Sequence, residues 1–150
     1  SRGLGDVYKR QPYHCRVLKK SRLELFTAPD NPLAQKKEVS FQDLADQPLV
    51  LFPDTFGQTR YLRRLFAQAR TEPQILHQTS QVFTILSYIR SGAGVGFLSE
   101  EFAQVEKELA AIPLQGVPAA SINLVWLQDP RTHPALGEFL AFVKNEAVKK

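Results

Sequence analysis

The sequence is poor in the residues and patterns on which secreted and membrane proteins depend. Its 150 residues contain one cysteine, Cys15, so an internal disulfide is excluded and the chain fits a reducing cytoplasm. No apolar run is long enough to span a bilayer, and no secretory signal is visible. With 43% hydrophobic and 23% charged residues, the composition is that of an ordinary soluble domain that can bury a core.

The motifs of common hydrolases and metalloenzymes are also missing. The sequence contains no G-x-S-x-G elbow and no H-E-x-x-H pair. Its histidines, His14, His77 and His133, are isolated from one another, and no second cluster accompanies the His14–Cys15 pair. We therefore expect no catalytic residues, no metal and no cofactor, and an enzyme is the less favoured class of protein.

The most informative segment runs over residues 77–100, HQTSQVFTILSYIRSGAGVGFLSE. Apolar side chains recur there at helical spacing, at Val82, Ile85, Leu86 and Ile89. They predict a helix over residues 80–91, which Thr79 or Ser80 can cap and which Gly92 can end in a left-handed conformation. The apolar run that follows predicts a buried strand over residues 95–98.

The glycines at positions 92, 94 and 96 raise the question of a nucleotide site. A phosphate cradle needs glycines after a strand and before a helix, where the free helix amides meet the anion. Here the glycines follow a helix and precede a strand. We therefore interpret them as a helix cap and as positions of close packing.

The remaining segments alternate between helices and short strands. Residues 22–28 predict a strand before the turn at Pro32, and residues 39–44 a short helix in which Ser40 and Asp43 can cap each other. Further strands are expected at 49–52, 74–77 and 122–128. Two further helices have apolar faces, one formed by Tyr61, Leu62, Leu65, Phe66 and Ala69 and the other lying over residues 134–147.

In order and spacing, these segments over residues 16–146 resemble the effector-binding domain of LysR-type transcriptional regulators. The resemblance implies an α/β fold of the type 2 periplasmic-binding-protein kind, with one nearly complete Rossmann-like lobe over residues 27–120. Residues 12–26 and 121–150 would supply the crossover strands and, with the C-terminal helix, a remnant of the other lobe. The alternation independently predicts a largely parallel sheet in the nearly complete lobe.

Residues 1–11, SRGLGDVYKRQ, look like translated adapter sequence, and we expect them to be a non-native leader. The family's helix-turn-helix, its linker helix and the first half of its effector domain would then be missing from this N-terminally truncated chain. In the family this C-terminal helix packs on the lobe that is mostly missing here. The apolar side chains of the helix over 134–147 would then be exposed, and we expect the isolated chain to be marginally stable.

Two polar turns follow predicted parallel strands and are expected to form half of an effector cleft for a small anionic or polar molecule. The candidate contacts are Pro53, Asp54, Thr55, Phe56, Gly57, Thr59, Arg60, Thr79, Ser80, Gln81, Thr84 and Ser99. For any one of these residues, a role as a helix cap is the simpler alternative.

The resemblance also implies a dimer or tetramer in the intact protein, with DNA bound through the absent N-terminal domain. The candidate interface residues are Gln74, Leu76, Phe83, Ser87 and Arg90. The arginines at 60, 63, 64 and 70 favour a solvated helix face over a nucleic-acid site, because no stacking aromatics accompany them. A free-standing solute-binding protein of the same fold is the main alternative function, and it would need an export signal.

Overall fold

The computed structural model describes residues 13–127, with side chains over residues 18–121. The chain divides into two compact units, residues 21–119 and residues 1–20 together with 120–150. In the second of these, β1 (Tyr13–Ser21) pairs with β7 (Ala120–Leu127). The expected leader and the expected helix over 134–147 lie outside the described residues. Within the described part of the chain, no helix is long and apolar enough to cross a bilayer.

The unit over residues 21–119 is built on a five-stranded sheet with the order β4-β3-β5-β2-β6. Its strands are β2 (Leu23–Thr27), β3 (Pro48–Leu51), β4 (Gln74–Gln78), β5 (Val95–Ser99) and β6 (Ala110–Pro113). Strand β3 is parallel to β4 and β5, whereas β2 is antiparallel to both β5 and β6. The expected largely parallel sheet is therefore found, with β2 as its reversed strand.

The two longer helices, α2 (Gly57–Gln68) and α3 (Val82–Arg90), lie where the apolar periodicity predicted them. The described residues also form the short helix α4 (Phe102–Val105) and, before α2, the 3-10 turns η1 (Pro32–Gln35) and η2 (Gln42–Leu44). The expected helix over 80–91 is shorter than predicted, because its N-cap is Gln81. Neither α4 nor β6 was predicted, since their short sequences, FAQV and AAIP, display no clear apolar run or period.

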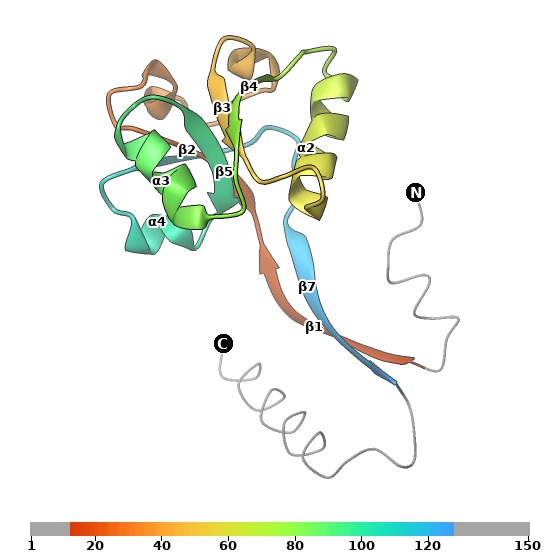
Figure 1. Ribbon diagram of the computed structural model, residues 1–150. Helices are drawn as coiled ribbons and strands as arrows, with labels where there is room; N and C mark the ends of the chain where they lie inside the picture. The colour runs from red at the N-terminus through yellow and green to blue at the C-terminus, as the bar shows by residue number, and fades with distance from the viewer. Residues whose placement is uncertain (1–12, 128–150) are drawn as a thin grey trace. The chain divides into compact units, whose positions relative to one another are not determined.

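Helices α2 and α3 cover opposite faces of the sheet (Figure 1). On the α2 face, Leu62 and Phe66 pack with Leu25, Leu49 and other apolar side chains. On the α3 face, Ile85, Leu86 and Ile89 pack with strand side chains that include Phe26, Val50 and Leu98. Strand β5 contributes to both cores, because successive strand residues point to opposite faces.

The glycines act as a cap and as packing positions, as interpreted from the sequence. Gly92 has φ 75° and its amide donates to the carbonyl of Ile89, while the amide of Ala93 reaches Tyr88, so α3 ends in a Schellman motif. Gly96 lies in β5 beneath α3, where a Cβ atom would stand 3.0 Å from both Ile85 and Ile89. The absence of a side chain at Gly96 lets the helix approach the sheet.

The capping pair before η2 is also confirmed. The Ser40 amide donates to Asp43 Oδ2 at 3.0 Å, and the Asp43 amide donates to Ser40 Oγ at 3.2 Å. Lys36 adds an ion pair to the same carboxylate at 2.8 Å. The hydrogen bond from Lys36, together with the bonds from Ser40, holds the pKa of Asp43 below its usual value of 3.8.

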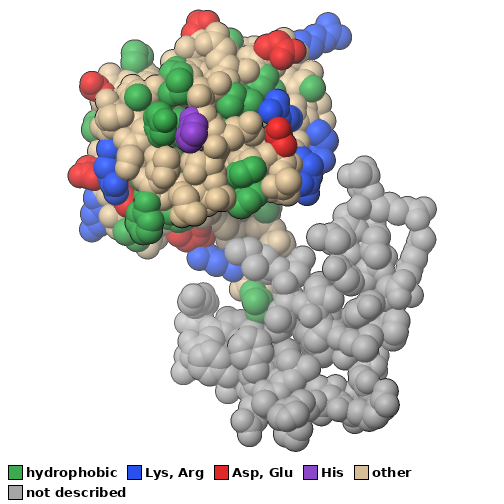
Figure 2. Space-filling view, in the orientation of Figure 1, with side chains coloured by type: hydrophobic (Ala, Val, Ile, Leu, Met, Phe, Trp, Pro, Cys, Tyr) green, Lys and Arg blue, Asp and Glu red, His purple; other side chains and the backbone are tan. Residues whose placement is uncertain are grey.

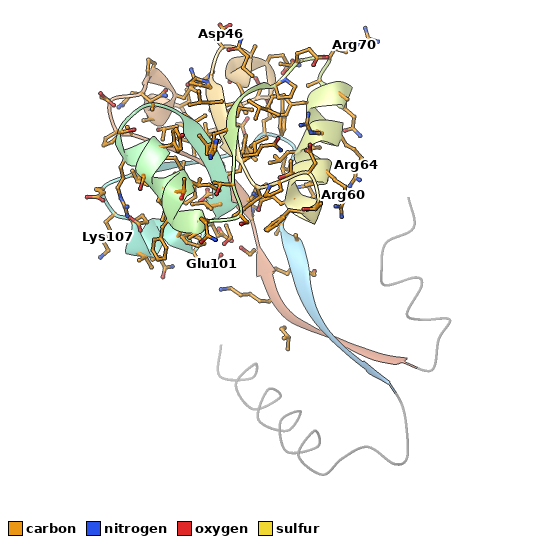
Figure 3. The ribbon with its side chains drawn as sticks, in the orientation of Figure 1. Asp46, Arg60, Arg64, Arg70, Glu101 and Lys107 are labelled. Carbon is orange, nitrogen blue, oxygen red and sulfur yellow. The ribbon has the colours of Figure 1, made fainter. Side chains whose placement is uncertain are left out.

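We predict that Asp43→Ala lowers the free energy of unfolding by about 0.5–2 kcal/mol at about pH 7, as for the loss of other caps. A carboxyl with a depressed folded-state pKa stabilises the fold above its unfolded value, so the difference from wild type should shrink as pH falls through the acid range below 3.8. Urea unfolding at a series of pH values measures both quantities. The matched control is Asp46→Ala, at an exposed carboxylate three residues away (Figure 3), which should change little. An equal effect of the two substitutions would contradict the capping role.

Candidate functional site

The carboxyl ends of β3, β4 and β5 lie at one edge of the sheet, because these strands are parallel neighbours. The antiparallel strand β2 brings its amino end to the same edge, where Leu23 pairs with Ser99. The chain runs from β3 through α2 to β4 on one side, and then returns through α3 to β5 on the other side of β3. Such a reversal of strand order is where open α/β sheets bind their ligands.

Hydrogen bonds hold the two predicted turns together at this edge. The amide of Thr79 donates to the carbonyl of Leu51 at 2.9 Å, which ties the turn after β4 to the end of β3. The Gln78 side chain reaches the carbonyl of Phe52 at 3.3 Å. From the first turn of α2, Gln58 donates to the carbonyl of Phe97 in β5 at 3.0 Å. The turns over 53–60 and 79–84 are therefore neighbours.

Several candidate contacts are already engaged within the protein. Thr59 is fully buried, and its hydroxyl donates to the carbonyl of Phe52 at 2.8 Å. Arg60 donates to the carbonyls of Asp54 and Thr55 at 3.2 and 2.6 Å. These two side chains hold the loop in shape, which favours a structural role for them over direct contact with a ligand.

Asp54 is likewise committed to neighbours. Its carboxylate accepts from Arg63 Nε at 2.7 Å and from the Gln78 amide at 3.3 Å. The hydrogen bond from Arg63, helped by that from Gln78, lowers the pKa of Asp54 below its ordinary value. Asp54 therefore stays ionised near neutral pH, and its charge is balanced by Arg63 before any ligand arrives.

Other predicted contacts remain accessible. Thr55, Phe56 and Gly57 are exposed before and at the start of α2, and Ser80 and Gln81 are exposed before α3. Half-buried positions complete the set, at Pro53, Thr79, Thr84 and Ser99. The Thr79 hydroxyl accepts from the amide of Gln81 at 3.1 Å, so Thr79 also closes the turn.

An aromatic wall borders the turn over 53–60. The Phe56 ring stacks on Phe52 with a centroid distance of 5.0 Å and an interplanar angle of 8°. Phe56 is nevertheless 39% exposed, which is high for a large apolar side chain. This exposure gives the turn an apolar surface beside its hydroxyl and amide groups.

The amino ends of α2 and α3 both face this edge and are electrostatically suited to an anion. Their N-cap residues, Phe56 and Gln81, have extended backbones and make no side-chain cap bond. Neither helix carries an acidic residue in its first turn. First-turn amides of a helix have no partner within the helix, so they are available to a negatively charged group.

Sequence reasoning missed the polar groups that the fold adds to the edge. Gln58 and Gln78 were not among the candidates, although Gln78 directly follows the strand predicted over 74–77 and Gln58 lies in the turn over 53–60, and in the structure Gln78 ends β4 and Gln58 stands in the first turn of α2. Glu24 and Glu100 also come to this end of the sheet through the pairing of β2 with β5. Burial, followed by the nearby Glu100 carboxylate, raises the pKa of Glu24, and Arg22 opposes this increase.

The basic side chains of α2 lie away from the sheet. Figure 2 shows Lys and Arg side chains on the α2 side of the unit, and Figure 3 shows Arg60 and Arg64 along the helix. Arg63 is paired with Asp54, and the Arg64 guanidinium lies 5.7 Å from the Tyr61 ring centroid. The pairing of Arg63 with Asp54 agrees with the expected solvated helix face, whereas the Tyr61 ring beside Arg64 shows that an aromatic side chain does accompany these arginines.

A separate hollow of about 260 Å³ lies at the other end of α2, where it is lined by Phe41, Gln68, Gln115 and neighbouring residues. This volume is below the range of roughly 300–1,000 Å³ typical of small-molecule sites. Among the described residues, no group of three or more His, Cys, Asp and Glu side chains is arranged to hold a metal ion.

The candidate interface residues lie on β4 and on the outer side of α3. Phe83 is 76% exposed and Leu76 is 49% exposed, while Gln74 and Ser87 are also at the surface. Strand β4 is the end strand of the five-stranded sheet. Arg90, by contrast, binds Glu106 and Glu108, and these bonds raise its pKa. The exposed apolar pair is therefore the stronger part of this candidate surface.

The family model described as "LysR substrate binding domain" matches residues 4–148. The chain belongs to this family. The matched range covers both polar turns and all strands of the sheet.

Curated relatives of this LysR domain are named as transcriptional regulators. The HTH-type transcriptional regulator CysB of Burkholderia cenocepacia is 28% identical over 102 residues, which are 67% of this chain and 33% of that protein. The RuBisCO operon transcriptional regulator of Allochromatium vinosum is 27% identical over 131 residues, 85% of this chain and 43% of that protein. The chain thus spans less than half the length of these two relatives.

Solved structures share the fold. The regulatory domain of Synechocystis PCC6803 CcmR in complex with 2-PG superposes with a TM-score of 0.80 at 16% identity, over 93% of this chain and 69% of that one. The effector-binding domain of QuiR in complex with shikimate has a TM-score of 0.76 at 21% identity, over 92% and 66%. The expected α/β fold of the type 2 periplasmic-binding-protein kind is confirmed.

Proposed function

We propose that this LysR domain senses a small anionic or polar metabolite at the edge formed by the turns over 53–60 and 79–84, and thereby controls transcription by a bacterial regulator that binds DNA through its N-terminal helix-turn-helix. The intact regulator would act in the cytoplasm. The domain would bind its effector without transforming it.

One observation carries this proposal. Helices α2 and α3, which have no side-chain N-cap bond, both begin at the edge of the sheet where the strand order reverses. The exposed residues Thr55 and Ser80 directly precede the N-cap residues of these helices, Phe56 and Gln81. A carboxylate or phosphate would gain the first-turn amides and the positive ends of both helix dipoles. Because the Asp54 charge is balanced by Arg63, it does not oppose a bound anion.

Two relatives suggest probes of the right chemistry. CcmR was solved with 2-PG and QuiR with shikimate. These complexes are properties of those proteins, and for this chain the two compounds serve as test ligands. Other small carboxylates belong in the same panel, because the hydroxyls and amides at this edge are not selective for a single carbon skeleton.

We predict that titrating the ¹⁵N-labelled chain with this panel yields at least one binder whose amide shifts cluster at residues 55–59, 79–82 and 99. Thr55→Ala and Ser80→Ala should each weaken binding by about tenfold or more, as for the loss of one hydrogen bond to a charged group. The matched control is Ser87→Ala, an exposed hydroxyl on the outer side of α3, which should leave binding unchanged.

Two outcomes would contradict the site. In one, no member of the panel shifts these amides. In the other, a binder shifts only the hollow lined by Phe41, Gln68 and Gln115.

We further propose that the surface formed by Leu76, Phe83, Gln74 and Ser87 packs against a second copy in the intact regulator. Phe83 leaves most of its area in water, although a buried Phe side chain contributes about 1.5–3 kcal/mol. Leu76 lies on the end strand of the sheet, where unpaired backbone groups also favour a partner. Arg90 would lie at the rim, because two carboxylates already hold it.

We predict that Phe83→Glu in the full-length regulator reduces the oligomer size measured by multi-angle light scattering, because a carboxylate in an apolar interface must be desolvated. Val105→Glu is the matched control, since Val105 is 78% exposed on α4 and lies outside the proposed surface. An unchanged mass for Phe83→Glu, or an equal loss in both variants, would remove this assignment.

A further inference from the structure

The chain leaves the five-stranded sheet at a junction that is hydrogen-bonded to the end of β5. Strands β1 and β2 are separated by the single residue Arg22, and the boundary between the two compact units falls between residues 20 and 21. Ser21 and Arg22 therefore stand at the point where the sheet unit begins. Directly opposite them are the residues that follow Ser99, a candidate effector contact.

Two glutamates hold this junction. The Glu100 amide donates to the carbonyl of Arg22 at 2.8 Å, and the Arg22 amide donates back to Glu100 Oε1 at 3.1 Å. The Ser21 hydroxyl, which is largely buried, donates to Glu101 Oε2 at 2.8 Å. Figure 3 labels Glu101 close to the start of α4. Both carboxylates are separated from their partners by about 80 residues of sequence.

We propose that Glu100 and Glu101 form a clamp that couples the effector-contacting end of β5 to the strand junction at Ser21–Arg22. The inference rests on the proposed function, because Ser99 supplies the contact to the effector. A ligand that displaces Ser99 acts on the next two residues, and these residues hold the junction through three hydrogen bonds. A coupling of this kind requires an element whose equilibrium both sites bias, and the end of β5 is that element in this proposal.

The charges around the junction support the clamp. Glu24 pairs with Leu98, so Arg22, Glu24 and Glu100 lie on one face of the β2–β5 ladder. Burial and the Glu100 charge raise the pKa of Glu24, whereas Arg22 lowers it. The pKa of Glu24 therefore depends on the position and charge of Glu100, although Glu24 is not itself one of the clamp residues.

Amide hydrogen exchange on the 150-residue chain tests the clamp without a ligand. Ser21→Ala removes the hydroxyl that donates to Glu101. Glu100→Gln replaces the carboxylate that accepts from the Arg22 amide by a neutral and weaker acceptor. Ser21→Ala should speed exchange on the opposite strand at Ser99 and Glu100, and Glu100→Gln should speed it on the opposite strand at Ser21 and Arg22. Each increase should be roughly fivefold or more, which corresponds to the loss of one hydrogen bond. The amides of the β3–β4 ladder should keep their rates.

The matched controls are Ser91→Ala, at an exposed hydroxyl beyond α3, and Glu72→Gln, at an exposed carboxylate before β4. A second measurement follows the Glu24 carboxyl by ¹³C NMR, where Glu100→Gln should lower the pKa of Glu24. Exchange that changes only at the mutated residue and its chain neighbours, or a Glu24 pKa that does not move, would overturn the clamp.

The exchange experiment separates the clamp from the proposed function. If the ligand panel fails to bind but each clamp variant changes exchange on the strand opposite to it, the effector site is wrong and the clamp stands. If a ligand binds at the edge and the variants act only locally, the effector site stands and the clamp is wrong.

Discussion

The structure depends on the burial of β5 against helices on both of its faces. Val95 and Phe97 point into the core beneath α2, and Leu98 points into the core beneath α3. Gly96 makes the second of these contacts possible, since a methyl group there would meet Ile85 and Ile89 at 3.0 Å. Close packing at this position fixes how near α3 lies to the sheet and hence where its amino end is presented.

The position of the candidate site follows from this packing. Because β3, β4 and β5 are parallel, both helices that follow β3 and β4 begin at the same edge. Hydrogen bonds from Gln58, Gln78 and Thr79 then connect the turns to the strand ends. At the same edge, Glu100 and Glu101 engage Ser21 and Arg22, so the candidate site and the start of the sheet unit share one strand end.

Much of the fold could be predicted because its signals are local. The spacing of Val82, Ile85 and Ile89, the glycine at 92 and the Ser40–Asp43 pair each act within a few residues. The details of the site depend on residues distant in the chain and could not be predicted in this way. The bond from Gln58 to the carbonyl of Phe97, the bond from Gln78 to the carbonyl of Phe52 and the approach of Glu100 to Arg22 are formed only by the folded chain. Short elements such as β6 also gave no pattern.

The most direct measurement of the central packing constraint compares the free energy of unfolding of Gly96→Ala with that of Gly57→Ala by urea denaturation. At Gly96 the added methyl group meets two isoleucines of α3, so the account predicts a loss of about 1–3 kcal/mol. At Gly57 the nearest atom is a flexible Arg60 nitrogen at 3.8 Å, and alanine favours the helix, so the change should be neutral or stabilising by up to about 1 kcal/mol. Equal stability of the Gly96→Ala variant and the wild type would contradict the account.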